Sequence, residues 1–239
     1  MSDMKQNCVA IILARGGSKG LPGKNTMDFC GKPLFAWSIL QAKNTPMISE
    51  VFVTSDDDHI LDIAQQYGAV CIKRPDEYAT DTVGLEPAIK HALGKIRNRQ
   101  KRDIDIVVCL QSTSPIRREN DINDAINQFI GEEVDSLFSA NVLEDCCIWQ
   151  PDGDIWKSIT YDYKNRGRRQ DRDPFYWENG SIYVFTPEIL YKNDNRVGGM
   201  ISVYLMPYWT SFEIDSLNDV EICSYYFEKK LLRRDLKKQ

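Results

Sequence analysis

The sequence predicts an α/β domain built on a mostly parallel β-sheet with helices on both of its faces. Two observations carry this prediction. Short, continuously apolar runs alternate with longer segments in which apolar residues recur every three or four positions. The chain of 239 residues suits one domain of generous size. Alternation of this kind produces β-α-β units, whose strands lie parallel and whose helices cover the sheet.

The first half of the chain contains most of these elements. Strands are expected over 8–14, 50–54, 69–72, 104–110 and 135–140, which are mainly apolar runs. Helices are expected over 34–42, 58–67, 86–96 and 121–130. In the helix over 86–96, for example, Ile89, Leu93 and Ile96 fall on one side.

The alternation breaks between residues 143 and 177, where the composition turns polar and aromatic. Pro151-Asp152-Gly153 is typical of a hairpin turn. We interpret 143–177 as an arm inserted in a single domain that spans 1–239. Because interfaces favour Trp and Tyr, the arm is expected to form a homodimer contact. The core resumes with strands over 181–185 and 201–206, and a last helix covers roughly 217–232.

Composition excludes several classes of function. The formal net charge of −5 disfavours a nucleic-acid partner, and no run approaches the ~20 apolar residues of a membrane helix. Seven scattered cysteines without C-x-x-C spacing, in a chain without a secretory signal, indicate reduced thiols and a cytoplasmic protein. Two histidines are too few for a His-rich metal site.

The strongest local signal is the segment over 15–25, RGGSKGLPGKN, which directly follows the first predicted strand. Ligands of open α/β folds bind beyond the carboxyl ends of strands, so the position is right for a ligand. Four glycines let the backbone N–H groups approach phosphate oxygens, and Arg15, Lys19 and Lys24 add positive charge. Neither G-x-x-x-x-G-K-[ST] nor G-x-G-x-x-G fits, because Asn25 follows Lys24 and Arg15 stands where the first glycine belongs.

Five segments in order resemble the motifs of CMP-sialic acid synthetases, a family that includes CMP-legionaminic and CMP-pseudaminic acid synthetases. They are 15–25, Arg74-Pro75 with 79–82 (ATDT), 110–115 (LQSTSP), 178–183 (ENGSIY) and 213–215 (EID). The resemblance spans nearly the whole chain. It implies a Rossmann-like nucleotidyltransferase that uses CTP and Mg²⁺ to convert an acidic nine-carbon sugar into its CMP derivative.

The resemblance also implies roles for individual residues. Arg15, Lys24 and Asp215 are the expected catalytic residues. The expected nucleotide contacts are Ala14, Arg15, Gly16, Gly17, Ser18, Lys24, Asn25, Arg74, Asp81 and Thr82. The expected sugar contacts are Gln111, Ser112, Thr113, Arg169, Gln170, Asn179 and Gly180.

Several of these residues have a structural alternative. Asp81 and Thr82 could instead cap the helix that starts near Glu86. The serines after Gln111 are expected to form a turn and cap the following helix, and Arg117 and Arg118 to be surface charges. Arg169 belongs to a cationic run that could simply be solvated.

The carboxylates of Glu213 and Asp215 are expected to hold Mg²⁺. Residues two apart on a strand share a face, and Mg²⁺ in proteins often takes one or two carboxylates plus substrate phosphates. An ordinary polar face of an edge strand is the alternative. The rival functions are a CMP-Kdo synthetase-like or other sugar nucleotidyltransferase, and a non-catalytic nucleotide sensor.

Overall fold

The computed structural model describes residues 6–18, 20–80 and 82–232. Its centre is a seven-stranded sheet with the order β11-β7-β10-β6-β1-β4-β5. The strands are β1 (Cys8–Leu13), β4 (Glu50–Ser55), β5 (Val70–Lys73), β6 (Ile106–Gln111), β7 (Ser136–Leu143), β10 (Phe175–Phe185) and β11 (Ile201–Met206). All pairings are parallel except those of β10, which runs antiparallel to both β6 and β7. The predicted mostly parallel α/β sheet is confirmed, with one reversed strand.

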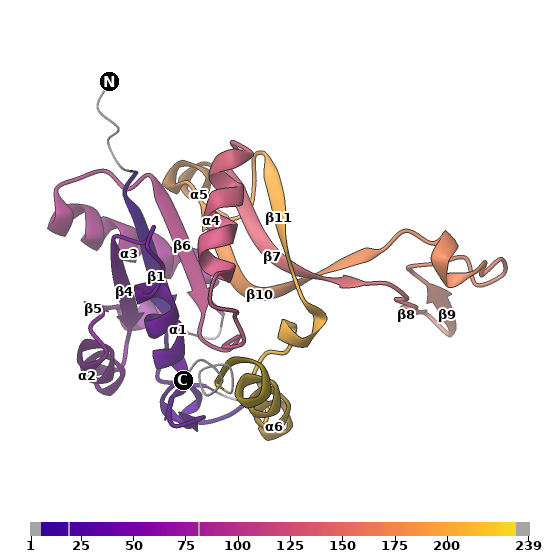
Figure 1. The fold of residues 1–239 in the computed structure, drawn as a ribbon, viewed down its shortest axis with the longest axis horizontal. Coiled ribbons are helices and arrows are strands. Elements are labelled where there is room, and N and C mark those ends of the chain that lie inside the picture. Colours follow the sequence, from indigo (N-terminus) through magenta and orange to yellow (C-terminus); the bar gives the residue numbers. More distant parts are fainter. Residues whose placement is uncertain (1–5, 19, 81, 233–239) are drawn as a thin grey trace, which may run out of the picture.

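Helices cover both faces of this sheet (Figure 1). One face packs against α1 (Leu34–Lys43), α2 (Asp58–Gln66) and α4 (Asp121–Gly131). The other face packs against α3 (Leu85–Gln100) and α5 (Pro187–Asn193).

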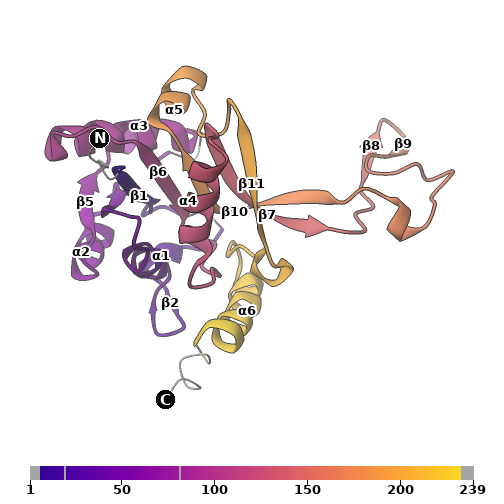
Figure 2. The ribbon, with the colours of Figure 1, turned by 45° about the horizontal axis from the view of Figure 1, so that its top comes forward.

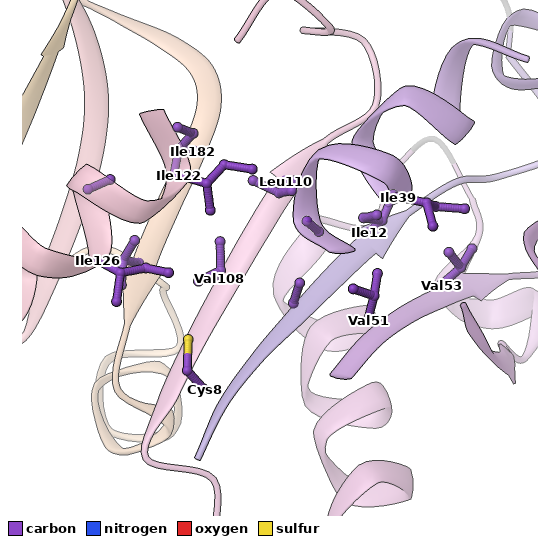
Figure 3. Packing of buried hydrophobic residues seen from close by; sticks show 14 of the residues in the cluster. Cys8, Ile12, Ile39, Val51, Val53, Val108, Leu110, Ile122, Ile126 and Ile182 are labelled. Carbon is purple, nitrogen blue, oxygen red and sulfur yellow. The ribbon is translucent and has the colours of Figure 1, made fainter. Parts of the chain in front are cut away.

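The central strand β1 explains why two cores form. Successive strand side chains point to opposite faces, so Ala10 and Ile12 enter one core while Val9 and Ile11 enter the other. Figure 3 shows the first core, where Ile12 lies beside Ile39 of α1 and Val53 of β4, and where Ile122 and Ile126 of α4 lie toward β6. Burial on both faces is typical of parallel strands and accounts for the continuous apolar run in the sequence.

A third, smaller core holds the C-terminal helix against the domain. α6 (Leu217–Tyr226) begins with a capping box of Ser216 and Asp219 and continues as a π-helical segment, Phe227–Leu232. Phe227 packs edge-on against Phe29 at 5.2 Å between ring centroids. Phe29 belongs to a short hairpin of β2 (Asp28–Phe29) and β3 (Lys32–Pro33). The same core buries Ile214, which fixes the chain next to the site described below.

The inserted arm is a two-stranded ribbon that leaves the sheet. β7 and β10 stay paired beyond the core, with Leu143 opposite Phe175, and carry a hairpin of β8 (Trp149–Asp152) and β9 (Ile155–Ser158). Figures 1 and 2 show this hairpin at the far end of the arm, well away from the sheet. Exposed aromatic side chains line the arm, namely Trp149, Trp156, Tyr163, Phe175, Tyr176 and Trp177. Pro151-Asp152-Gly153 leads into the turn between β8 and β9, as predicted.

Two differences from the sequence prediction have local reasons. β10 begins at Phe175 rather than at 181, because its first four residues pair with β7 in the arm and stay exposed instead of entering the core. The helix α5 was not predicted because it has only seven residues. In the described part of the chain, no helix is both long and apolar enough to cross a membrane.

Candidate active site

A pocket opens at the carboxyl ends of β1, β5 and β6, with a cavity volume of about 290 Å³. The loop after β1 contributes Arg15, Ser18, Lys24 and Asn25. The segment after β5 contributes Arg74, Tyr78, Ala79 and Thr80. The end of β6 and the turn after it contribute Cys109, Gln111, Ser112 and Thr113, and Tyr183 and Arg196 complete the wall. The structure thus gathers three of the five sequence motifs directly around one cavity, and Tyr183 adds the end of a fourth.

The glycine-rich loop is fixed in place by Asn25. Its side-chain amide donates to the Arg15 carbonyl at 2.9 Å, and its Oδ1 accepts from the Ser112 hydroxyl at 2.7 Å. Ala14 is buried, and its N–H reaches the carbonyl of Thr54 at 3.2 Å. A Cβ added at Gly17 would meet no atom, so the backbone there is open to a ligand. Asn25 therefore fixes the conformation of the loop. Its hydrogen bond with Ser112 connects the loop after β1 to the turn after β6.

Sequence reasoning missed a carboxylate behind the loop. Asp56 follows β4, and its Oδ1 accepts from the Arg74 guanidinium at 3.2 Å and from the Gly16 N–H at 3.3 Å. Arg74 is only 3% exposed, and burial lowers its pKa. A Cβ at Gly16 would lie 2.7 Å from Oδ2 of Asp57, so this position requires glycine. The signal for Asp56 in the sequence was its place at the carboxyl end of a predicted strand.

Lys24 contacts Asp215, one of the two carboxylates that the sequence analysis expected on a strand. Its Nζ lies 2.7 Å from Oδ1 of Asp215, whose side chain is 72% exposed. The strand itself was wrong, since residues 213–215 form a loop before α6. Ile214 between them is fully buried and donates its N–H to the Thr113 carbonyl at 2.8 Å. This anchoring, rather than a strand face, brings the two carboxylates to the phosphate loop.

Glu213 lies deeper than Asp215, on the side of β6. Its Oε2 accepts from the amide of Gln111 at 3.4 Å. Burial, with a smaller contribution from the negative charge of Asp215, raises the pKa of Glu213 to about 7. A Cβ at Gly180 would clash with both Glu213 and Gln111, and the φ of +66° at Gly180 also favours glycine. Gly180 therefore allows these two polar side chains to approach the backbone of β10.

Arg117 was expected at the surface and is instead among the most buried charges of the protein, at 2% exposure. Its guanidinium donates to the carbonyls of Ser181 at 2.8 Å and Gln111 at 2.7 Å, and to the side chains of Ser38 and Gln41. Burial lowers its pKa to about 9, so the group remains charged at neutral pH. The expectation failed because periodicity does not apply in a turn, where a side chain can point inward.

Asn179 is also a structural anchor. Its side chain accepts from Ser139 at 2.6 Å and donates to Asn141 at 2.8 Å, and the residue is 1% exposed. Ser114 donates to the Asn179 carbonyl at 3.4 Å. These bonds hold the irregular stretch of β10 around Gly180.

The expected helix caps are not formed by the motif residues. Gly84 occupies the N-cap of α3 without a side-chain bond, and Asn120 occupies that of α4. Thr82 instead shares a hydrogen bond with Thr80, at 3.3 Å. The capping alternatives for Thr82 and for the serines after Gln111 are therefore wrong. Asp81 and Lys19 lie outside the described residues.

The Arg168–Gln170 segment lies in the arm, and Arg168 and Gln170 are not among the residues that line the pocket. Arg168 pairs with Asp171 at 2.8 Å, Gln170 is exposed, and the side chain of Arg169 lies outside the described part of the structure. Of the described side chains, neither Arg168 nor Gln170 is brought to the other motifs within a single chain.

Comparison with known proteins shows which family has this sequence and site. A family model described as cytidylyltransferase matches residues 9–147, which include the glycine-rich loop, Arg74 and Gln111. The chain belongs to the cytidylyltransferase family. It is similar to the pseudaminic acid cytidylyltransferase of Campylobacter jejuni, with 32% identity over 94% of this chain and 97% of the relative.

Two further relatives of this cytidylyltransferase carry different names. The CMP-N,N'-diacetyllegionaminic acid synthase of Legionella pneumophila is 35% identical over 77% of this chain and 80% of its own length. The N-acylneuraminate cytidylyltransferase of Escherichia coli is 31% identical over 95% of this chain and 54% of its own length.

Solved structures show the same fold at low identity. The CMP:2-keto-3-deoxy-manno-octonic acid synthetase complexed with CTP superposes with a TM-score of 0.70 at 18% identity, covering 95% of this chain and 100% of its own. The 4-diphosphocytidyl-2C-methyl-D-erythritol synthase of Anaerococcus prevotii gives 0.64 at 14% identity, with 94% and 99% coverage. The predicted nucleotidyltransferase fold is therefore confirmed.

Proposed function

We propose that this cytidylyltransferase transfers CMP from CTP to the anomeric hydroxyl of a nonulosonic acid and releases pyrophosphate. The contact of Lys24 with Asp215 carries the proposal, because it joins a lysine that lines the pocket, on the basic loop, to a carboxylate. The names of the relatives, which include pseudaminic, legionaminic and N-acylneuraminic acids, support the acceptor class.

CTP binds over the loop after β1 in this proposal. Backbone N–H groups of Gly17 and Ser18 are offered to the phosphates, and Arg15 and Lys24 balance their charge. Arg74, held by Asp56, lies toward the base and ribose, beside the Thr80–Thr82 segment. Gln111, Ser112 and Thr113 lie on the opposite side, toward the acceptor.

The donor set near Lys24 fits Mg²⁺. Asp215 and Glu213 offer carboxylate oxygens, and triphosphate oxygens would complete a typical magnesium shell. Among the described residues, no group of three or more His, Cys, Asp or Glu side chains could hold a metal by itself. Bound there, the ion would neutralise charge on the phosphates and lower the pKa of the attacking hydroxyl.

The residues of the chain act by positioning and by charge stabilisation, which dominate phosphoryl-transfer catalysis. The anomeric oxygen forms a bond to the α-phosphorus in line, the bond from that phosphorus to the bridging oxygen breaks, and pyrophosphate takes the electron pair. The hydroxyl proton leaves to solvent or to a nearby base. Arg15 and Lys24 stabilise the charge that develops on the α-phosphate and on pyrophosphate.

Pyrophosphate release with Mg²⁺ tests this function. CTP, UTP, GTP and ATP are crossed with N-acetylneuraminic, legionaminic, pseudaminic and Kdo acids. We expect release with CTP and a nine-carbon acid. Release with another nucleotide, or with Kdo as the only active acid, would contradict the proposed specificity for CTP and a nine-carbon acid. If no combination releases pyrophosphate although the protein binds CTP measurably, a nucleotide sensor would be favoured.

We also propose that the arm forms a homodimer. Its exposed Trp and Tyr side chains suit an interface, and a partner's arm would give the Arg169–Gln170 motif a route to an acceptor. Analytical ultracentrifugation of the whole chain and of a Trp156→Ser, Trp177→Ser variant tests this. A wild-type monomer at micromolar concentration would contradict it.

A further inference from the structure

The turn after β4 connects the ends of two other strands. Oδ1 of Asp56 accepts from Nη2 of Arg74, which follows β5, at 3.2 Å. The same oxygen accepts from the N–H of Gly16, in the loop after β1, at 3.3 Å. In the strand order β1-β4-β5, Asp56 directly follows the middle strand. One carboxylate oxygen therefore joins the segment after β5 to the glycine-rich loop.

The orientation of Arg74 depends on this contact. The residue is 3% exposed and lines the pocket, and its backbone N–H donates to the Ser55 carbonyl at 2.8 Å. Its Nη2 donates to Asp56, whereas its Nε is buried and has no hydrogen-bond partner among the described residues. A guanidinium held in this way keeps donor capacity for a ligand in the pocket.

Asp56 also supplies a negative charge that this part of the pocket needs. Arg15 lines the same pocket as Arg74. Burial, and to a smaller extent the charge of Arg15, lower the pKa of Arg74, while Asp56 opposes both effects. A buried cation beside a second cation is costly without a partner. Asp56 is 21% exposed and is not among the residues that line the pocket, so it acts on a ligand through Arg74.

From this arrangement we infer that Asp56 is a positioning residue for the nucleotide, an inference that rests on the proposed use of CTP. Its carboxylate fixes the Arg74 guanidinium against the glycine-rich loop, so the nucleoside contacts and the phosphate contacts are aligned before CTP binds. Groups that are already ordered lower the cost of binding. A nucleotide that spans both parts of the pocket benefits, whereas a ligand that occupies the glycine-rich loop alone does not.

Two other roles for Asp56 lead to different results. If the carboxylate acts only as a negative charge near the triphosphate, its removal should strengthen the binding of every polyphosphate. If it only stabilises the fold, its removal should weaken CTP and a simple polyphosphate equally. Positioning through Arg74 predicts a third result, in which CTP is weakened and a polyphosphate without a nucleoside is not.

The same turn contains a matched control. Asp58 pairs with Lys73 at 2.6 Å, and these side chains are 81% and 52% exposed. Neither residue is among those that line the active-site pocket. Asp58→Ala therefore removes the same charge two residues further along the chain and leaves the contacts of Arg74 in place.

Isothermal titration calorimetry tests the inference by measuring Kd for CTP and for tripolyphosphate, both with Mg²⁺. The proteins are wild type, Asp56→Ala, Asp58→Ala, Arg74→Met and the double variant that combines Asp56→Ala with Arg74→Met. Asp56→Ala should raise Kd for CTP at least about 10-fold, as expected when hydrogen bonds to charged groups are lost, and should leave Kd for tripolyphosphate unchanged or lower. Asp58→Ala should change both constants by less than about threefold.

The double variant shows whether Asp56 acts through Arg74. When Arg74 is already Met, Asp56→Ala should cause no further loss of CTP affinity, because residues that act as one unit are not additive. The proposed reaction provides a second measurement. At saturating CTP, Asp56→Ala should leave KM for the acid acceptor unchanged, whereas KM for CTP should rise with its Kd.

The outcomes distinguish this inference from the proposed function. An unchanged or lower Kd for CTP in Asp56→Ala overturns the inference, and so does an equal loss for CTP and tripolyphosphate or a further loss in the Arg74→Met background. A wild type that binds CTP no more tightly than tripolyphosphate refutes the use of CTP, and the inference with it. A wild type that binds CTP tightly but releases no pyrophosphate with any acid refutes the proposed transfer alone. If Asp56→Ala does not fold, Asp56→Asn, which keeps the size of the side chain, decides by the same comparison of ligands.

Discussion

Replacing Arg117 by Met should remove the hydrogen bonds that connect the end of β6 to β10 and to α1. The guanidinium makes four contacts between 2.7 and 3.0 Å, to Gln111, Ser181, Gln41 and Ser38, and a fifth at 3.2 Å to the same Ser181 carbonyl. Hydrogen bonds to charged groups contribute about 1.5–3 kcal/mol each, but removing the cation also removes its desolvation cost. The substitution leaves several buried acceptors without a donor, at about 1–3 kcal/mol each, so we expect a net loss of about 3–5 kcal/mol of unfolding free energy.

Urea unfolding of the metal-free protein measures this loss. Arg99→Met is the matched control, because Arg99 is 58% exposed and pairs only with Glu50 at the surface. That control should change the unfolding free energy by no more than about 1 kcal/mol. In thermal unfolding, the Arg117 variant should fall by about 6–20 °C, given 2–4 °C per kcal/mol for a chain of this size. A loss below about 1 kcal/mol, equal to that of Arg99→Met, would refute the reasoning that this cation holds the end of β6.

Three further predictions concern the site. Lys24→Ala should lower kcat at least about tenfold, since the lysine balances phosphate charge, and an unchanged kcat with intact circular dichroism would remove it from the mechanism. Asp56→Ala should lower the unfolding free energy by about 2–4 kcal/mol, because it leaves the buried Arg74 unpaired, whereas Asp58→Ala, on the exposed Lys73, should change it little. Burial raises the pKa of Cys109 to about 11, so its alkylation by iodoacetamide, followed by peptide mapping, should still be accelerating between about pH 7 and 9 and should be slowed by CTP. Fast alkylation at pH 8 that CTP does not affect would contradict this placement.

The sequence predicted the sheet well because its strands are buried on both faces. A strand such as β1 reads as a continuous apolar run, and amphipathic helices such as α2 reveal their buried face by spacing. The arm was harder to delimit, because its strands have exposed side chains and no core that selects their residues. The start of β10 depends on pairing with β7, which is a long-range contact.

The site residues could be predicted where they belong to a short local sequence motif. The glycine-rich loop, Arg74 and Gln111 converge on the pocket because each lies at the carboxyl end of a strand, and β1, β5 and β6 run parallel in one sheet. Asp56 was missed because its partners Arg74 and Gly16 are distant in the chain, and Arg196 was missed because it lines the pocket from outside any of the motifs. Glu213 and Asp215 were placed on a strand, although the burial of Ile214 in the third core is what positions them. The burial of Arg117 could not be predicted for the same reason, because the exposure of a residue in a turn depends on which distant segments pack around it.

Identification of the product tests the central claim most directly. CTP labelled with ¹⁸O on the α-phosphate is incubated with Mg²⁺ and the preferred nonulosonic acid, and the products are separated and weighed by mass spectrometry. The account predicts equal amounts of pyrophosphate and a CMP ester of the acid that carries the label. Free labelled CMP without the ester, or a CDP-linked product with inorganic phosphate, would contradict transfer of CMP to the sugar.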